Sequence, residues 1–410
     1  METLSLINTE FSSALKSKIV VCCLLGMLCI VACDTDDNNN NNTGSTRTVN
    51  WASAADSSSR SLVTNFWYAG ANRLYFNNNS GAPNDWNSNY WPQAHALDVL
   101  VDAYIRTEDI FYLNVMNNWL VGVHRGNGNR WANNFIDDME WIGLAAFRAW
   151  KATGNEGFLT ACRDVWDGTT TNMDDNNAAF GIKRAWTTAG GGGIFWESRS
   201  NRHSKNACSN APAAILAAWL YNEFGDEEDL EWAKRIYSWQ KQYLFNSNTG
   251  AVYDNLNTTT NVTNRDWIFT YNQGTFLGAA LELYKITGET SYINDAVKAA
   301  DYTLAVLINT ADNLLRSEGT GDGGLFKGIF IRYFTQLILS DGISDNARMR
   351  YISALKRHGE ALWLEGTNKE RVLFGPYWKT PPGATTGLTE HLSGCMLIEA
   401  LALLDAKGML

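Results

Sequence analysis

Residues 145–154 read AAFRAWKATG, residues 217–225 read AAWLYNEFG, and residues 279–288 read AALELYKITG. These three segments decide the fold. Each begins with two alanines, places an aromatic residue four positions before a glycine, and ends on that glycine. Alanine favours a helix, and a glycine just after a helix commonly adopts the left-handed conformation that ends it. We therefore predict three alanine-rich helices that end at these glycines.

The spacing of the repeated segments predicts helical hairpins. Gly225 follows Gly154 by 71 residues and Gly288 follows Gly225 by 63, which leaves room in each unit for a second, more polar helix and a long loop. Alanine-rich helices pack closely enough for an inner ring, and amphipathic partners cover them outside. About six such pairs fill residues 51–410, so we predict a single all-α domain, an (α/α)6 toroid or barrel of helical hairpins. The alternatives are an α-solenoid, with repeats of about 34 to 47 residues, and a helical bundle.

Hydrophobic periodicity supports a chain that is helical almost throughout. Apolar residues recur at steps of three and four, as on one face of a helix, in many segments. Examples are Ala94–Ile105, Glu140–Lys151, Ala213–Phe224, Leu230–Leu244, Thr275–Ile286, Tyr292–Leu307, Gly328–Leu339, Asn346–Leu364 and Cys395–Ala406. Only six prolines occur in the chain, so little interrupts these helices.

Composition favours a neutral carbohydrate as the ligand. The formal net charge is −10, which argues against nucleic acid and mildly against polyanionic glycans. The 17 Trp, 16 Tyr and 17 Phe can fill a large core, or they can stack on the C–H faces of pyranose rings. Asparagine, glycine and aromatic residues lie together in the loops 76–81, 126–131, 190–196 and 255–264. That combination suits a cleft in which amides bond sugar hydroxyls.

We expect the first fifty residues to target the chain to its cellular location and not to form part of the folded domain. Residues 1–32 combine a basic start, an apolar run and a small-residue end, as in a signal peptide. The run Ile30–Cys33 resembles a bacterial lipobox with Cys33 as the lipidated residue; in an ordinary signal peptide this cysteine would be incidental. The acidic, asparagine-rich residues 33–50 predict a disordered tether. We expect a surface-exposed lipoprotein of the outer membrane, held by its lipid anchor only, with the periplasm as the alternative.

No cofactor or metal is expected. After removal of the signal peptide and lipidation of Cys33, an odd set of three cysteines remains, Cys162, Cys208 and Cys395, without C-x-x-C spacing. This pattern implies neither a disulfide framework nor a zinc site. Residues 319–324 contain a lone G-x-G-x-x-G, but no βαβ pattern surrounds it, so a nucleotide site is not expected.

Asp137 and Asp138 are the candidate catalytic residues. They lie where a loop rich in glycine and asparagine enters an alanine-rich helix, and Trp131 and Trp141 flank them. Acidic side chains at a helix start can simply cap it or oppose its dipole. Glycoside hydrolysis, however, needs two carboxyl groups, and repulsion between like charges raises one of their pKa values and so helps to provide the acid. The pair Asp174–Asp175 lies in a polar, asparagine-rich stretch, so for this pair we expect no catalytic role.

Five blocks of sequence resemble glycoside hydrolase family 76 in their order along the chain. They are DDMEW (137–141), GGGIFW (191–196), SNAP (209–212), YNQG (271–274) and FKGIF (326–330). The resemblance implies an (α/α)6 fold and a retaining, endo-acting α-1,6-mannanase that hydrolyses the α-mannan backbone. It also implies that Asp137 is the nucleophile and Asp138 the general acid/base. The resemblance leaves open that the enzyme transfers mannan chains instead of hydrolysing them.

Seven further residues are candidates for the cleft, against the alternative that they belong to the core or brace a loop. The candidate substrate-binding residues are Trp131, Trp196, Tyr271, Asn272 and Gln273, and weaker candidates are Trp91 and His95. The expected partners are α-1,6-linked mannan and mannooligosaccharides, and the chain is expected to be a monomer. Two other functions remain: a non-catalytic glycan-binding lipoprotein of the cell surface, and an enzyme of the same fold that acts on another neutral glycan.

Overall fold

The computed structural model describes residues 48–70, 75–81, 90–168, 181–198 and 202–410. The predicted signal peptide, Cys33, nearly all of the tether and the pair Asp174–Asp175 therefore lie outside the described residues. Residues 49–410 form one unit, and the description below is of that unit. None of its described helices is both long and apolar enough to span a membrane.

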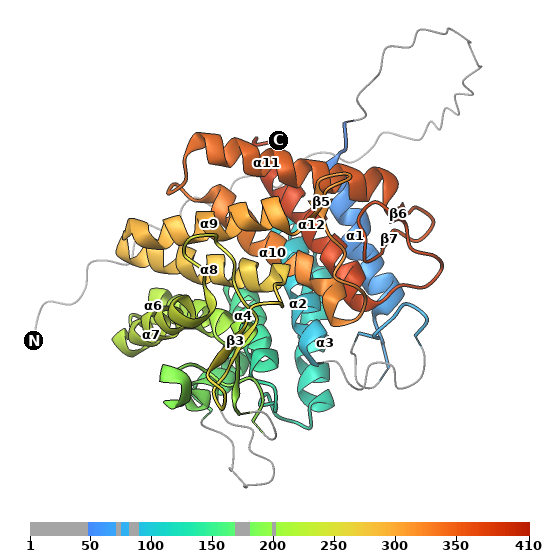
Figure 1. The fold of residues 1–410 in the computed structure, drawn as a ribbon. Coiled ribbons are helices and arrows are strands. Elements are labelled where there is room, and N and C mark those ends of the chain that lie inside the picture. Colours follow the sequence, from blue (N-terminus) through green and yellow to red (C-terminus); the bar gives the residue numbers. More distant parts are fainter. Residues whose placement is uncertain (1–47, 71–74, 82–89, 169–180, 199–201) are drawn as a thin grey trace, which may run out of the picture. The chain divides into compact units, whose positions relative to one another are not determined.

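Twelve α-helices in the described residues alternate between an inner and an outer position (Figure 1). The inner helices are α2 (Tyr90–Thr107), α4 (Ile136–Thr153), α6 (Ala211–Phe224), α8 (Thr270–Thr287), α10 (Asp322–Leu339) and α12 (Leu388–Ala406). Each inner helix packs against the next, and α12 packs against α2, which closes the ring. The prediction of an (α/α)6 toroid is confirmed.

The outer helices each cover the inner helix next to them. They are α1 (Trp51–Phe66), α3 (Ile110–Gly126), α5 (Glu156–Asp167), α7 (Glu227–Leu244), α9 (Thr290–Val306) and α11 (Asp345–Glu360), the last continued by a π-helical turn at Ala361–Glu365. Helix α1 comes before the first inner helix in the sequence but packs mainly on α12, the last inner helix. This contact completes the sixth pair. The more polar helices predicted after the three alanine-rich ones are α5, α7 and α9, and all three lie in this layer.

The repeated glycines end their helices as predicted. Gly154, Gly225 and Gly288 have φ of 69°, 72° and 70° and follow α4, α6 and α8 directly. The backbone N–H of each glycine donates to the carbonyl of the aromatic residue four positions earlier, at 2.7–2.8 Å. This is the left-handed C-cap, which glycine adopts without steric cost.

Small residues allow the inner helices to approach closely. All alanines of the repeated segments except the half-buried Ala152 are buried. At Gly274 on α8, an added Cβ would lie 2.5 Å from the Cα of Phe330 on α10, and at Gly328 on α10 it would lie 2.7 Å from the Cα of Ser393 on α12. The backbones themselves are therefore in contact at these two points.

Helix α1 was not among the segments that periodicity singled out, because serines occupy its buried face. Ser58, Ser59 and Ser61 are buried, so the apolar pattern is broken. Their hydroxyls are satisfied: Ser59 donates to Glu399 at 2.6 Å and Ser58 to the Ala55 carbonyl at 3.1 Å. Helices α3 and α5 were likewise not singled out.

Short strands lie in the loops between helices. Strands β1 (Ser204–Asn206), β2 (Asn255–Asn257) and β3 (Val262–Asn264) form one antiparallel sheet in the order β1-β2-β3. Two further hairpins are β4 (Ile308–Asn309) with β5 (Leu314–Leu315), and β6 (Thr367–Asn368) with β7 (Leu373–Phe374).

Replacing Gly274 by alanine tests the close approach of α8 and α10. We expect Gly274→Ala to lower the free energy of unfolding by about 1–3 kcal/mol, because the new methyl group meets backbone atoms that cannot turn away. Gly383→Ala is the matched control, since nothing lies within 4 Å of a Cβ at that exposed site. Guanidinium chloride unfolding measures both, and equal midpoints would show that the two helices are not in backbone contact.

Candidate active site

One cavity opens at the N-terminal ends of the inner helices. Its volume is about 700 Å³, and its lining includes Trp91 of α2, Asp137 and Asp138 of α4, Tyr271 of α8 and Asp322 of α10. Each of these residues lies in the first turn of its helix. Because the ring closes, side chains far apart in the sequence face one space.

The aspartate pair lines this cavity, and neither aspartate holds the N-cap position of its helix. Residue Phe135 holds the N-cap position of α4 without any side-chain bond. The start of the helix is anchored through its backbone instead, since the Ile136 N–H donates to the Trp196 carbonyl at 2.9 Å. Neither aspartate forms an ion pair within the described ranges. Capping accounts for one contact of the pair, in which Asp137 accepts the first-turn N–H of Asp138, and it does not account for the Asp138 side chain.

Two side-chain donors and one backbone donor hold the carboxylate of Asp137. Its Oδ2 accepts the Trp196 indole N–H at 3.2 Å and the Cys208 thiol at 3.2 Å. Its Oδ1 accepts the backbone N–H of Asp138 at 3.1 Å. Burial raises the pKa of Asp137 to about 6, and these hydrogen bonds oppose the rise by stabilising the anion.

Asp138 has no such support. Within the part of the chain that the structure describes, its carboxyl accepts no hydrogen bond. Burial and the charges of Asp137 and Asp322 raise its pKa well above the usual range. The pair thus combines a carboxylate, Asp137, with a neutral acid, Asp138. Glycoside hydrolysis requires one group of each kind.

A buried lysine holds the glycine-rich loop that carries Trp196. The Lys205 ammonium donates to the carbonyls of Thr187 at 2.8 Å and Ala189 at 2.6 Å, and also to that of Gly192. Gly193 has φ of 88°, and a Cβ there would lie 2.5 Å from the Trp239 ring. Glycine is therefore required where this loop passes over the tryptophan.

Three asparagines form a row beside the cavity. Asn206, Asn255 and Asn264 are in register across β1, β2 and β3, and all three line the cavity. Ser204 adds a hydroxyl that bonds Asn206 at 2.6 Å and Asn255 at 3.2 Å. The asparagine-rich loop 255–264 thus supplies the amides that its composition predicted for a sugar cleft.

The candidate substrate-binding residues divide into two groups. Trp196 and Tyr271 line the cavity, whereas Asn272 and Gln273 are fully buried behind it. Asn272 donates to Asp254, a cavity residue, at 3.1 Å, while Gln273 bonds the backbone of the loop before β2. These two amides support the wall of the cavity from behind.

Trp131 lies outside this cavity lining. Its ring stacks with Trp119 at 6.2 Å and contacts His124. Of the weaker candidates, Trp91 does line the cavity, and its indole N–H donates to Asp322 at 3.1 Å. His95 is buried against the Trp91 ring, and burial lowers its pKa to about 3, so it is neutral.

Several lining residues were not singled out from the sequence. Asp322 lies in the glycine-rich run 319–324, where only a nucleotide motif had been weighed. Phe326 stacks face to face with Tyr271 at 3.9 Å, and Trp267 is 58% exposed at the cavity. Cys208 lies next to the SNAP block, but a single cysteine offers no spacing signal.

No group of three or more histidine, cysteine or acidic side chains is placed to hold a metal ion among the described residues. Cys162, Cys208 and Cys395 are free and buried.

Comparison with known proteins identifies the family of the chain. The model of glycosyl hydrolase family 76 matches residues 50–410. The chain belongs to this family. The family 76 α-1,6-mannanase GH76A from Salegentibacter sp. HEL1_6 is 41% identical, with a TM-score of 0.79 over 87% of this chain and 100% of that chain. A variant of that enzyme with two consecutive aspartates replaced by asparagines is inactive and was solved with α-1,6-mannotriose.

Two more distant relatives agree with this assignment. A family 76 mannosidase from Bacteroides thetaiotaomicron, 21% identical, has a TM-score of 0.73 over 88% of this chain and 100% of its own, which supports the fold. The mannan endo-1,6-α-mannosidase of Candida albicans is 28% identical over 158 residues. That match covers 35% of this chain and 34% of the yeast protein, so it spans about a third of the curated relative.

The Cys208 thiol provides a test of the family 76 site. Cys208→Ala removes one donor from Asp137, so the pKa of Asp137 should rise above its value of about 6, whereas Cys208→Ser keeps a hydroxyl donor and should not raise it. Carboxyl ¹³C NMR titration of aspartate-labelled protein measures this pKa, with the signal assigned by its loss in Asp137→Asn. An equal pKa in the alanine and serine variants would mean that the thiol does not act on Asp137.

Proposed function

We propose that this family 76 chain is a retaining, endo-acting α-1,6-mannanase that hydrolyses the α-mannan backbone. The observation that supports it most is the pair Asp137 and Asp138, which faces one cavity lined by aromatic rings and amides. It is the one pair of consecutive aspartates in the described residues. In the 40%-identical Salegentibacter enzyme, replacement of two consecutive aspartates gives an inactive protein.

The environments of the two carboxyl groups support the proposed roles. The Asp137 carboxylate attacks the anomeric carbon as the glycosidic C–O bond breaks, and Asp138 gives its proton to the departing oxygen. A glycosyl ester on Asp137 results. Asp138, now anionic, takes a proton from water, whose oxygen attacks the same carbon and releases Asp137. Two displacements at one carbon retain its configuration.

The rest of the cavity suits a neutral polysaccharide. The stacked rings of Tyr271 and Phe326 and the exposed ring of Trp267 offer faces for pyranose C–H groups. The asparagine row of the small sheet offers amides for hydroxyls. No lysine or arginine lines this cavity in the described part of the chain, so an anionic glycan would find no countercharge.

For the N-terminal region, we propose the arrangement expected from the sequence. Residues 1–32 are a signal peptide, Cys33 is lipidated, and residues 33–50 tether the catalytic domain to the outer face of the outer membrane. Incorporation of a labelled fatty acid into the wild type but not into Cys33→Ser would support the anchor, and equal labelling would contradict it. Protease accessibility on intact cells distinguishes the surface from the periplasm.

Substitution of either aspartate tests the proposed reaction. Asp137→Asn and Asp138→Asn should each lower the release of reducing ends from unbranched α-1,6-mannan by at least about a thousandfold, because each removes one of two groups that act together. Asp405→Asn, at an exposed position of α12, is the matched control and should keep full activity. NMR of the first products should show the α anomer.

Other outcomes of this assay identify the alternatives. Full activity in either aspartate variant would reject the site. Binding of mannan without any release of reducing ends by the wild type would indicate a glycan-binding protein. Products longer than the substrate would indicate transfer, and cleavage of a different neutral glycan in a panel would indicate another specificity.

A further inference from the structure

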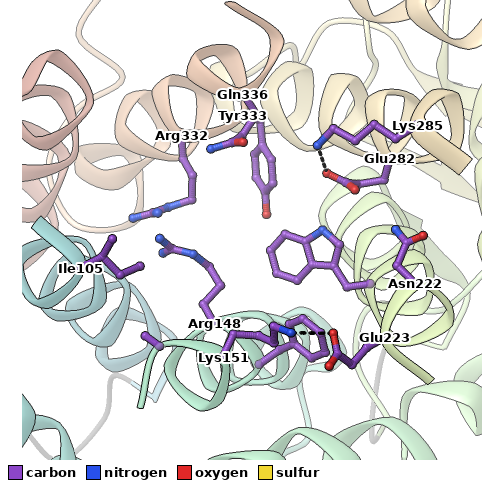
Figure 2. A pocket seen from close by; sticks show the side chains of 13 residues that line it. Ile105, Arg148, Lys151, Asn222, Glu223, Glu282, Lys285, Arg332, Tyr333 and Gln336 are labelled. Carbon is purple, nitrogen blue, oxygen red and sulfur yellow. Dashed lines mark hydrogen bonds and ion pairs between the residues drawn. The ribbon is translucent and has the colours of Figure 1, made fainter. Parts of the chain in front are cut away.

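A second cavity lies at the opposite end of the inner helices. Its volume is about 480 Å³, and residues from the last turns of α2, α4, α6, α8 and α10 line it (Figure 2). Asp137 and Lys151 mark the two ends of α4, and a rise of 1.5 Å per residue separates them by about 21 Å. This cavity is therefore distinct from the catalytic one, with which it shares no lining residue.

Every charged side chain of this second cavity already has a partner of opposite charge. Figure 2 shows Arg148 and Arg332 reaching toward each other from α4 and α10. The pairs are Lys151 with Glu223 at 2.7 Å, Lys285 with Glu282 at 2.8 Å, Arg332 with Asp102 at 2.9 Å, and Arg148 with Asp98 and Asp102. The four cationic side chains are thus matched by four carboxylates, so the cavity offers a charged ligand no net countercharge.

The uncharged polar groups of this cavity are, in contrast, unpaired. The Tyr333 hydroxyl points into the cavity from α10 (Figure 2). It makes no hydrogen bond within the described residues, nor do the amides of Asn222 and Gln336 or the indole N–H of Trp219. A ligand of this cavity is thus offered hydroxyl and amide partners but no free charge.

An aromatic face completes the site. The half-buried Trp219 ring lines the cavity, and Phe147 backs it at a centroid distance of 5.7 Å and an angle of 30°. Phe147 is 7% exposed, so the indole rests on a fixed support. A ring that stacks on one side, beside unpaired amide and hydroxyl groups, recognises a neutral molecule with a C–H face and several hydroxyls.

We propose that this cavity, formed around Trp219, is a second carbohydrate-binding site that takes a neutral hexopyranose segment. The identity of that segment, α-1,6-linked mannose, rests on the proposed function. The site holds the polysaccharide on the face of the ring away from the aspartates. It raises the concentration of polymer near the enzyme without taking part in bond cleavage.

Binding to an inactive protein tests this site. In the full chain carrying Asp137→Asn and Asp138→Asn, calorimetry with α-1,6-mannotetraose should find two binding sites. Adding Trp219→Ala should leave one, and adding Asn222→Ala, at an exposed position that cannot disturb folding, should weaken the second site by about tenfold. Trp363→Ala is the matched control, because that half-buried tryptophan lines neither cavity.

Hydrolysis by otherwise unchanged protein separates this inference from the proposed function. Trp219→Ala and Asn222→Ala should cleave α-1,6-mannotetraose at the wild-type rate but polymeric mannan several-fold more slowly at low polymer concentration. One binding site in the inactive protein, or equal rates on polymer for both variants and the wild type, would overturn the second site and leave the mannanase intact. Absence of hydrolysis by the wild type, with Trp219-dependent binding of mannotetraose, would overturn the mannanase and support the second site.

Discussion

Two side-chain hydrogen bonds reach Asp137 and, among the described residues, none reaches Asp138, and the proposed chemistry depends on that asymmetry. Adjacent carboxyl groups in one cavity cannot both ionise easily, because each anion opposes the other. The indole of Trp196 and the thiol of Cys208 decide which group keeps the charge. Asp138, near Asp322 and without donors, keeps the proton. Two identical residues thus differ in their tendency to hold a proton, as the proposed nucleophile and acid require.

The ring of helices makes this asymmetry possible. Asp137 comes from α4, Trp196 from the glycine-rich loop, and Cys208 from the turn before α6, so three separate segments must meet within hydrogen-bonding distance. Lys205 fixes the loop by its carbonyls, and backbone contacts at Gly274 and Gly328 set the spacing of the inner helices. The first turns of the inner helices line the cavity that holds the aspartates, and their last turns line the second cavity.

Much of the fold and of the site could be predicted from the sequence because the patterns that indicate them are local. A left-handed glycine after an alanine-rich helix is a short-range pattern, and all three repeated glycines have it. The aspartate pair and its neighbouring blocks were equally visible, as was the asparagine-rich loop that lines the cavity. Helix α1 was not, because its buried positions hold serines whose hydroxyls find partners only in the folded chain.

The remainder of the site could not be predicted because it is made by contacts between distant segments. Trp131 and Trp196 both flank motifs rich in glycine or asparagine, yet one ring packs on Trp119 and the other bonds Asp137. Nothing in their immediate neighbours distinguishes them. Cys208 reaches Asp137 through the packing of α6 and its preceding turn on α4, and Asp322 comes near Asp138 from α10 on the other side of the cavity. The spacing of these residues in the sequence does not indicate either contact.

Covalent trapping tests most directly whether Asp137 is the charged partner. A fluorinated α-mannosyl fluoride slows the second displacement, so the glycosyl ester accumulates and mass spectrometry of the digested protein locates it. We expect a single fluoromannosyl adduct on Asp137, absent from Asp137→Asn. An adduct on Asp138, or turnover of mannan with inversion and no adduct at all, would contradict this expectation.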